Sequence, residues 1–221
     1  MYDDVATYPS LAGRSVLVTG GGSGIGAEIV RHFAHQKARV AFIDIEKGAS
    51  AALAEEVAGR GGAARFYNCD LTDIAALRAT IDRVAADQGP VTVLVNNAAN
   101  DQRHPMEEVT PDYWDERFAV NLKHQFFAAQ AVAPGMREAG GGAIVNMGST
   151  SWMVGQGGMP CYTSSKSAVL GLTRSLARDL GPDNIRVVSV VPGWTMTQRQ
   201  LDNWLTPEAE AAYVRLSAAA A

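Results

Sequence analysis

The chain has 221 residues, of which 47% are hydrophobic, and this is enough apolar material for the core of one large domain. Its net charge of −4, with no run of lysine or arginine, argues against binding to nucleic acid or to an anionic membrane. The two cysteines, Cys69 and Cys161, are far apart, and no Cys/His spacing typical of a metal site is present. We therefore expect no bound metal.

The start of the chain carries no targeting signal that we recognise. Residues 1–10 contain acidic side chains and no apolar segment, so we expect neither a signal peptide nor a membrane anchor there. No apolar run elsewhere reaches the length that a bilayer requires. The expected compartment is the cytoplasm, where both cysteines would be reduced.

Apolar runs typical of buried strands alternate along the chain with amphipathic segments typical of helices. The predicted strands are residues 15–19, 39–43, 64–69, 92–96, 143–147 and 186–191, and the predicted helices are residues 25–36, 47–60, 73–86, 111–138 and 159–180. Strict alternation builds βαβ units with right-handed crossovers and a parallel sheet. The predicted fold is α/β: one domain over residues 1–221, with a doubly wound parallel sheet and helices on both faces (a Rossmann fold).

A glycine-rich turn lies between the first predicted strand and the first predicted helix. Residues 19–26 read T-G-G-G-S-G-I-G. Glycines in this position permit a tight turn and a close approach of the backbone to a pyrophosphate, which the helix N-terminus attracts. The predicted cofactor-binding residues of the turn are Gly20, Gly22, Ser23, Gly24, Ile25 and Gly26.

Asp44 ends the second predicted strand, eighteen residues after Gly26. A carboxylate there can accept hydrogen bonds from both hydroxyl groups of the adenosine ribose, and it would repel a 2′-phosphate. The next residues, Ile45 and Glu46, add no basic side chain. The predicted cofactor is therefore NAD rather than NADP.

Polar residues also end the third and fourth predicted strands. Asp70 is a candidate acceptor for the adenine amino group, and a capping role at the strand–helix junction is an equal alternative. Asn97, in N-N-A-A at residues 96–99, is a candidate ligand of the cofactor ribose, and a purely structural bond to the backbone is as plausible.

The predicted catalytic residues are Ser149, Tyr162 and Lys166. Lys166 follows Tyr162 by four residues, so their side chains share one face of the predicted helix. An ammonium beside a phenol favours the ionised phenol, which can then act as a base, so we expect Lys166 to lower the pKa of Tyr162. Ser149 ends the preceding strand and is expected to orient the reacting oxygen.

Taken in order, these motifs resemble the short-chain dehydrogenase/reductase family. Typical members carry T-G-x-x-x-G-x-G, N-N-A-G, an asparagine, a serine, Y-x-x-x-K and P-G. This chain matches them at residues 19–26, residues 96–99, Asn121, Ser149, Tyr162 with Lys166, and Pro192 with Gly193. The similarity runs from about residue 10 to about residue 200, and Ala99 stands where glycine is usual.

The resemblance implies further roles for individual residues. Asn121 would hold a water that links Lys166 to solvent, Lys166 would bind the nicotinamide ribose, and Thr197 would bind the nicotinamide carboxamide. Other positions that it assigns to the cofactor are Leu71, Asn97, Ala98, Pro192, Gly193, Thr195 and Tyr162. It also implies a homotetramer or homodimer, built from the predicted helices at residues 111–138 and 159–180.

The end of the chain departs from the family pattern. After residue 191 the sequence predicts a loop, a helix at about residues 208–216, and four alanines at residues 218–221. Family members usually continue with another helix and a last strand. We see neither, so we expect that strand to be missing from this sequence and one edge of the sheet to be open.

Several stretches, including N-D-Q-R-H at residues 100–104 and N-L-K-H at residues 121–124, are similar to the NAD-dependent aldose 1-dehydrogenases of this family. These oxidise the anomeric carbon of D-xylose, L-arabinose or L-rhamnose to a lactone. The candidate sugar contacts are Ser149, Ser151, Gln156, Tyr162 and Trp194, with Trp152 as a second stacking residue. His104 is a weaker candidate, because a histidine in a loop is more often structural or simply exposed to solvent.

Two other functions remain open at this stage. One is an NAD-dependent dehydrogenase of another secondary alcohol, such as a polyol or a hydroxysteroid. The other is a non-catalytic scaffold that binds a dinucleotide on the same fold. The Ser149, Tyr162 and Lys166 set argues against the scaffold, because a protein that only binds a dinucleotide needs no base.

Overall fold

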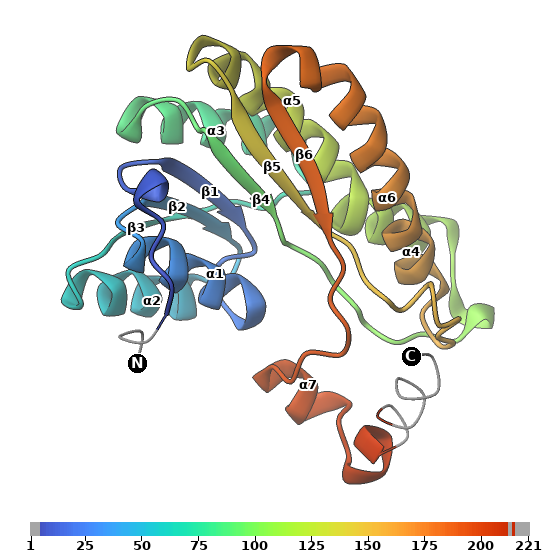
Figure 1. The fold of residues 1–221 in the computed structure, drawn as a ribbon. Helices are drawn as coiled ribbons and strands as arrows, with labels where there is room; N and C mark the ends of the chain where they lie inside the picture. The colour runs from blue at the N-terminus through green and yellow to red at the C-terminus, as the bar shows by residue number, and fades with distance from the viewer. Residues whose placement is uncertain (1–4, 212–213, 215–221) are drawn as a thin grey trace.

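The computed structural model of the chain describes residues 5–211 and residue 214. Within them, six parallel strands form one sheet in the order β3-β2-β1-β4-β5-β6 (Figure 1). The strands are β1 Ser15–Thr19, β2 Arg39–Asp44, β3 Ala63–Asn68, β4 Val93–Asn96, β5 Gly142–Met147 and β6 Ile185–Val190. This is the strand order of the doubly wound dinucleotide-binding fold, so the predicted fold class is confirmed.

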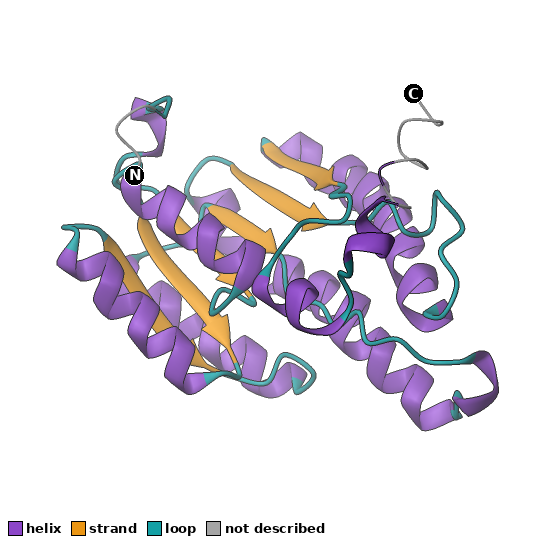
Figure 2. Cartoon of the chain, turned by 90° about the horizontal axis from the view of Figure 1, so that it is seen from below, coloured by secondary structure: helices purple, strands orange, loops and turns teal. Residues whose placement is uncertain are grey.

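Helices cover both faces of the sheet (Figure 2). They are α1 Gly24–His35, α2 Lys47–Gly59, α3 Ile74–Gln88, α4 Pro111–Phe118, α5 His124–Glu138, α6 Pro160–Leu180 and the short α7 Gln198–Asn203. One apolar core lies between the sheet and α1 with α2, and the second lies between the opposite face and α3, α5 and α6. The two cores share the same strands, which makes the chain a single domain.

Strand β1 shows why its sequence is apolar throughout. Val16 and Val18 belong to the core beneath α1 and α2, whereas Leu17, between them, belongs to the core on the opposite face. Side chains of a strand alternate between its two faces, so a strand covered on both sides must be apolar at every position. All three side chains are fully buried.

The long helix predicted at residues 111–138 is helical throughout, but the type of helix changes in its middle. It consists of α4 and α5, joined by a π-helical segment, Ala119–Lys123, that contains Asn121. Short π-helical segments occur mostly inside α-helices, so the sequence reads as one helix.

The last part of the chain also differs from the prediction. The region after β6 was expected to be a loop, but it contains α7, which lies beyond the carboxyl ends of the strands (Figure 1). Of the helix predicted at residues 208–216, residues 208–211 and 214 are helical, and residues 212, 213, 215 and 216 lie outside the described residues. Within the described residues, β6 pairs only with β5. None of the described helices is long and apolar enough to span a membrane.

The strand order also locates the place where a ligand would bind. The crossovers run in one direction from β1 to β3 and in the other from β4 to β6, so the connections diverge between β1 and β4. In such sheets the crevice at the carboxyl ends of these two strands is the usual ligand site. The glycine-rich turn and residues 96–99 both lie there.

Candidate active site

The glycine-rich turn joins β1 to α1 in a conformation that depends on two of its glycines. Gly20 has φ +64°, and a Cβ placed on it would lie 2.7 Å from the Cα of Ala98. A Cβ on Gly26 would lie 1.9 Å from the carbonyl oxygen of Gly20. Only glycine allows the backbone to pass this closely, so the turn has the shape that pyrophosphate binding needs.

Hydrogen bonds from β4 hold the turn in place. The Thr19 hydroxyl accepts from the backbone N–H groups of Asn97 and Ala98, at 3.0 and 3.1 Å. The Asn97 side-chain amide donates to the carbonyls of Thr19 and Gly20, at 3.1 and 2.9 Å. Of the two roles open to Asn97, the structure therefore shows the backbone one, and its role in cofactor binding stays a prediction.

Asp44 lies beside the same turn, as expected. Its Oδ2 accepts from the backbone N–H of Gly22 at 2.8 Å, and its Oδ1 accepts from the backbone N–H of Glu46 at 3.0 Å. Ser23, the N-cap residue of α1, makes no capping bond with its side chain. The turn thus combines the N-terminus of α1 with a partly exposed carboxylate, which fits the pyrophosphate and ribose of a dinucleotide.

The structure corrects the alternative role considered for Asp70. Asp73, not Asp70, caps α3, and its side chain accepts from the backbone N–H of Ala76 at 3.0 Å. The Asp70 carboxylate instead accepts from the N–H and the hydroxyl of Thr72, at 2.9 and 2.7 Å. The side chain of Leu71 is buried in the core. Adenine binding by Asp70 and cofactor binding by Leu71 remain predictions.

Ser149, Tyr162 and Lys166 come together in one cleft at the carboxyl ends of the strands. The cleft has about 940 Å³ of empty space, part of which is continuous with solvent. Ser149 follows β5, and the other two residues lie in the first half of α6. The Nζ of Lys166 lies 5.6 Å from the centre of the Tyr162 ring and donates to the carbonyl of Met147 at 2.8 Å.

The pKa of Tyr162 in the protein chain by itself is raised, and the expected lowering of this pKa by Lys166 stays a prediction. Burial raises the pKa of Tyr162, and this effect outweighs the hydrogen bond to Ser149, which lowers it. The negative charge of Asp101 raises it further, and the positive charge of Arg103 lowers it. Lys166 is itself buried, which lowers its own pKa to about 8 and weakens it as a source of positive charge.

Asn121 is fully buried in the π-helical segment and reaches a neighbouring loop. Its side-chain oxygen accepts from the backbone N–H of Asn100 at 2.8 Å, and its amide donates to the Asn100 carbonyl at 3.1 Å. The sequence did not indicate this contact. Asn121 therefore fixes the loop that begins at Asn100, and its predicted role in holding a water stays a prediction.

The candidate sugar contacts divide into two groups. Ser151, Gln156 and Trp194 line the cleft with Ser149 and Tyr162. Trp152 does not, because it faces a separate hollow beside Thr163 and Ser167. The structure therefore does not support the stacking role considered for Trp152.

His104 has the structural role that the sequence favoured. Its Nδ1 lies 3.0 Å from both the Gln102 carbonyl and the Tyr113 hydroxyl. Its Nε2 accepts from the backbone N–H of Cys161 at 3.4 Å. The imidazole joins the loop after β4 to α4 and to the start of α6, and it does not line the cleft.

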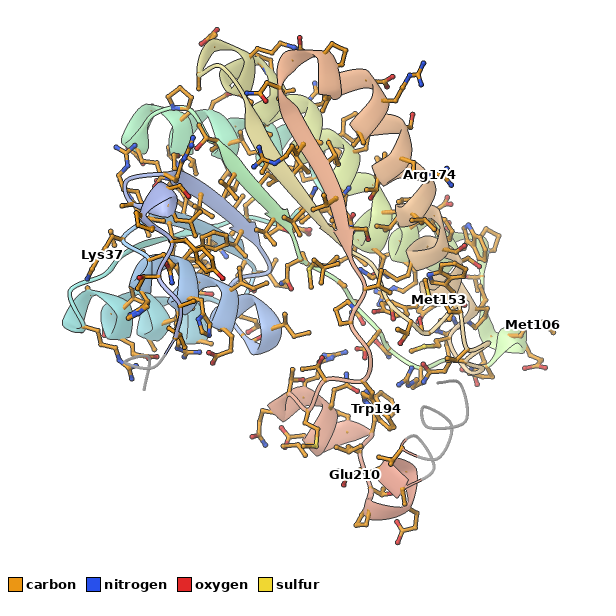
Figure 3. The ribbon with its side chains drawn as sticks, in the orientation of Figure 1. Lys37, Met106, Met153, Arg174, Trp194 and Glu210 are labelled. Atoms are coloured by element: carbon orange, nitrogen blue, oxygen red, sulfur yellow. The ribbon has the colours of Figure 1, made fainter. Side chains whose placement is uncertain are left out.

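The far wall of the cleft is the segment of residues 191–203, which we call the strap. It runs from the end of β6 through Trp194 to α7 (Figure 3). Five predicted residues of the strap line the cleft: Pro192, Gly193, Trp194, Thr195 and Thr197. The strap thus joins the predicted nicotinamide contacts to the predicted sugar contacts.

Sequence reasoning missed five polar residues that line the cleft: Asp101, Arg103, Thr150, Arg199 and Gln200. Two of them, Asp101 and Arg103, lie in the N-D-Q-R-H stretch that is similar to the sugar dehydrogenases. Single polar residues in loops follow no periodicity, so no local pattern marked them as lining a cleft. Within the described residues, no group of three or more His, Cys, Asp and Glu side chains gathers as a metal site would require.

A family model described as short chain dehydrogenase matches residues 14–206. The chain belongs to the short-chain dehydrogenase family. It is an oxidoreductase of the class that acts on CH–OH groups, and the catalytic residues predicted for it stand in one cleft.

Two relatives of this short-chain dehydrogenase carry names that refer to sugars. It is 51% identical over 209 residues to the D-xylose 1-dehydrogenase of Caulobacter vibrioides, covering 95% of this chain and 82% of that protein. It is 52% identical over 202 residues to the probable galactose dehydrogenase GalD of Rhizobium meliloti, covering 91% of this chain and 79% of that protein.

Among solved structures, the short-chain dehydrogenase resembles a putative NAD(P)-dependent gluconate 5-dehydrogenase from Beutenbergia cavernae, which has NADP bound at low occupancy. The TM-score is 0.86 at 33% sequence identity, covering 93% of this chain and 82% of the other. The shared fold supports dinucleotide binding of the NAD(P) type.

Proposed function

We propose that the protein oxidises the C1 hydroxyl of an aldose to a lactone with NAD. The observation that carries the proposal is the cleft in which Ser149, Tyr162 and the buried Lys166 lie together next to the glycine-rich turn. The choice of an aldose is supported by two relatives named for xylose and galactose that are more than half identical to this chain.

The residues around the turn fit a dinucleotide. Close backbone packing at Gly20 and Gly26 holds the turn at the N-terminus of α1, which attracts a pyrophosphate. The Asp44 carboxylate has acceptor capacity left for ribose hydroxyls after its bonds to Gly22 and Glu46. A 2′-phosphate would bring further negative charge toward Asp44, which supports NAD over NADP. When bound, NAD supplies the acceptor for the hydride that leaves the sugar carbon.

Three side chains of the cleft have separate roles in the proposed reaction. The Tyr162 oxygen takes the proton of the C1 hydroxyl, acting as the general base. The Ser149 hydroxyl accepts from the backbone N–H of Ser151 at 3.1 Å, which fixes it where it can orient the sugar oxygen. Lys166 uses one of its three donors on the Met147 carbonyl and keeps two for the nicotinamide ribose.

We also propose a cytoplasmic homotetramer or homodimer whose subunits meet through α4, α5 and α6. Each of these helices exposes a large apolar side chain, namely Trp114, Phe126 and Leu170, at 38–39% exposure. Light scattering after size-exclusion chromatography would measure the assembly, and a monomer at micromolar concentration would contradict the proposal.

The test of the activity is NADH formation, followed by absorbance, with a panel of substrates and with NAD or NADP. The panel contains D-xylose, D-galactose, L-arabinose and L-rhamnose, together with polyols and a steroid alcohol. We expect turnover of at least one aldose, with NAD preferred, and a rate that rises with pH because the base acts in its ionised form. Turnover only of polyols or steroids would overturn the choice of an aldose. NADH binding without any turnover would favour the scaffold.

A further inference from the structure

Asp101 is an acidic residue in a cleft that is otherwise neutral or basic. Among the described residues that line the cleft, it is the one aspartate or glutamate, whereas Arg103, Lys166 and Arg199 are cationic. It lies in the loop after β4, the loop that Asn121 fixes at Asn100. Its side chain is 20% exposed, so the carboxylate stays accessible from the cleft.

The Asp101 carboxylate is held in place from across the cleft. Its Oδ1 accepts from Nε of Arg199 at 3.2 Å, and its Oδ2 accepts from Nε2 of Gln200 at 2.6 Å. Gln200 in turn accepts from the indole N–H of Trp194 at 2.7 Å. The two walls of the cleft therefore meet at this carboxylate, and its orientation is set before a substrate arrives.

These bonds leave the carboxylate half of its acceptor capacity. An ionised carboxylate has about four lone-pair sites, two on each oxygen. Arg199 and Gln200 take one site on each oxygen. The remaining pair, one on each oxygen, suits two donors that are held side by side, and neighbouring hydroxyl groups on a sugar ring are such donors.

Asp101 also lies close to the reacting end of the cleft. Its charge raises the pKa of Tyr162, and it partly offsets the fall in the pKa of Lys166 that burial causes. If the C1 hydroxyl of an aldose contacts Tyr162, the other hydroxyl groups of the sugar lie within a few ångströms of it. They would then face the walls of the same cleft.

We propose that Asp101 is a specificity-determining residue that binds sugar hydroxyl groups other than the one at C1. The proposal rests on the proposed aldose oxidation. Asp101 selects substrates with hydroxyl groups at the positions it reaches, and it disfavours alcohols that lack them, because its desolvated acceptors would then remain unpaired. Arg199, Gln200 and Trp194 position it and do not themselves make this selection.

The experiment measures kcat/KM for the wild type and for Asp101→Ala with D-xylose and with its 2-, 3- and 4-deoxy analogues, or with the D-galactose series if galactose is the better substrate. A hydrogen bond to a charged group is worth about 10- to 100-fold in binding. We expect Asp101→Ala to lose about that factor on the complete sugar. On at least one deoxy sugar, which already lacks the contact, the variant and the wild type should be nearly equal.

The matched control is Asp82→Ala, which removes the same charge from an exposed position on α3. It should leave all of these ratios unchanged. Thermal unfolding and NADH titration of each variant verify that the fold and the cofactor site are intact.

Each outcome separates the two proposals. If the wild type oxidises no aldose with NAD, the proposed function fails. If the wild type does so but Asp101→Ala lowers kcat/KM equally for the complete sugar and every deoxy sugar, Asp101 only holds the strap, and the inference is overturned. It is also overturned if Asp101→Ala behaves as the wild type.

Discussion

The proposed cofactor side and the proposed substrate side of the cleft are built in different ways. On the cofactor side, Thr19 and Asn97 tie the ends of β1 and β4 together through bonds that involve the backbone, and two glycines are required by close backbone contacts. On the substrate side, α7 is attached through side chains, with Arg199 and Gln200 bound to Asp101 at separations of 98 and 99 residues in the chain. A site that is fixed by backbone geometry restricts the residue type at each position. A site that is fixed by side-chain contacts can be built from many different combinations of residues.

The largest expected effect is at Tyr162, where the two sides meet. Tyr162→Phe removes the proton acceptor and keeps the ring, so we expect kcat for sugar oxidation to fall by about three orders of magnitude. The affinity for NADH, measured by fluorescence titration, should be unchanged. Tyr8→Phe, at an exposed position, is the matched control. Near-normal turnover of Tyr162→Phe would contradict the assignment of the base.

Lys166 provides a test of burial at the same junction. Burial lowers its pKa from 10.5 to about 8, so between these pH values the unfolded chain binds more protons than the folded one. The free energy of unfolding should therefore rise with pH over this interval, by on the order of 3 kcal/mol at about 1.4 kcal/mol for each pKa unit. Below pH 8 the full cost of the buried charge is present.

Lys166→Met removes this titration. Urea unfolding of both proteins between about pH 7.5 and pH 10 measures the free energy of unfolding. The difference between wild type and variant should change across this range by up to about 3 kcal/mol. Lys47→Met, at an exposed position, should show no such change. If the difference in free energy of unfolding between wild type and Lys166→Met does not change with pH, the lysine stays charged throughout, which contradicts its lowered pKa.

On the proposed cofactor side, adding a single methyl group at a glycine should weaken the binding of NADH. In Gly26→Ala the new Cβ would meet the Gly20 carbonyl oxygen, so the turn must open. Overpacking of this kind costs about 1–3 kcal/mol, which corresponds to a roughly 5- to 150-fold weaker binding of NADH if the strain is relieved in the turn. Gly48→Ala, which meets no atom within 4 Å in α2, should bind NADH normally. Equal affinities for the two variants would be inconsistent with a backbone-defined turn.

The smallest expected effect distinguishes two tryptophans on the substrate side. Trp194 lines the cleft and Trp152 faces a different hollow, although both lie close in sequence to predicted catalytic or cofactor residues. We expect Trp194→Ala to raise KM for the sugar several-fold, to about tenfold, through loss of an apolar contact. Trp152→Ala should leave KM unchanged. The reverse result would mean that the strap is arranged differently when sugar binds.

Individual residues show how far the sequence was informative. Strand β1 was predicted with its observed bounds because each position is buried on one face or the other. The helix predicted at residues 111–138 has the observed bounds, but the sequence did not reveal the π-helical segment at residues 119–123, because such a segment lies inside a continuous helix. The role of His104 depended on Tyr113 and Cys161, and no local pattern connects these residues.

The sequence by itself determined the α/β sheet, the glycine-rich turn, the acidic residue beside it, and the set of Ser149, Tyr162 and Lys166. These follow from local periodicity and from turns that accept only particular residue types. Only the tertiary structure decided that burial raises the pKa of Tyr162, that Trp194 and not Trp152 lines the cleft, and that Asp101 joins its two walls. Desolvation and side-chain contacts between distant segments depend on how the whole chain packs, and no short stretch of sequence carries that information.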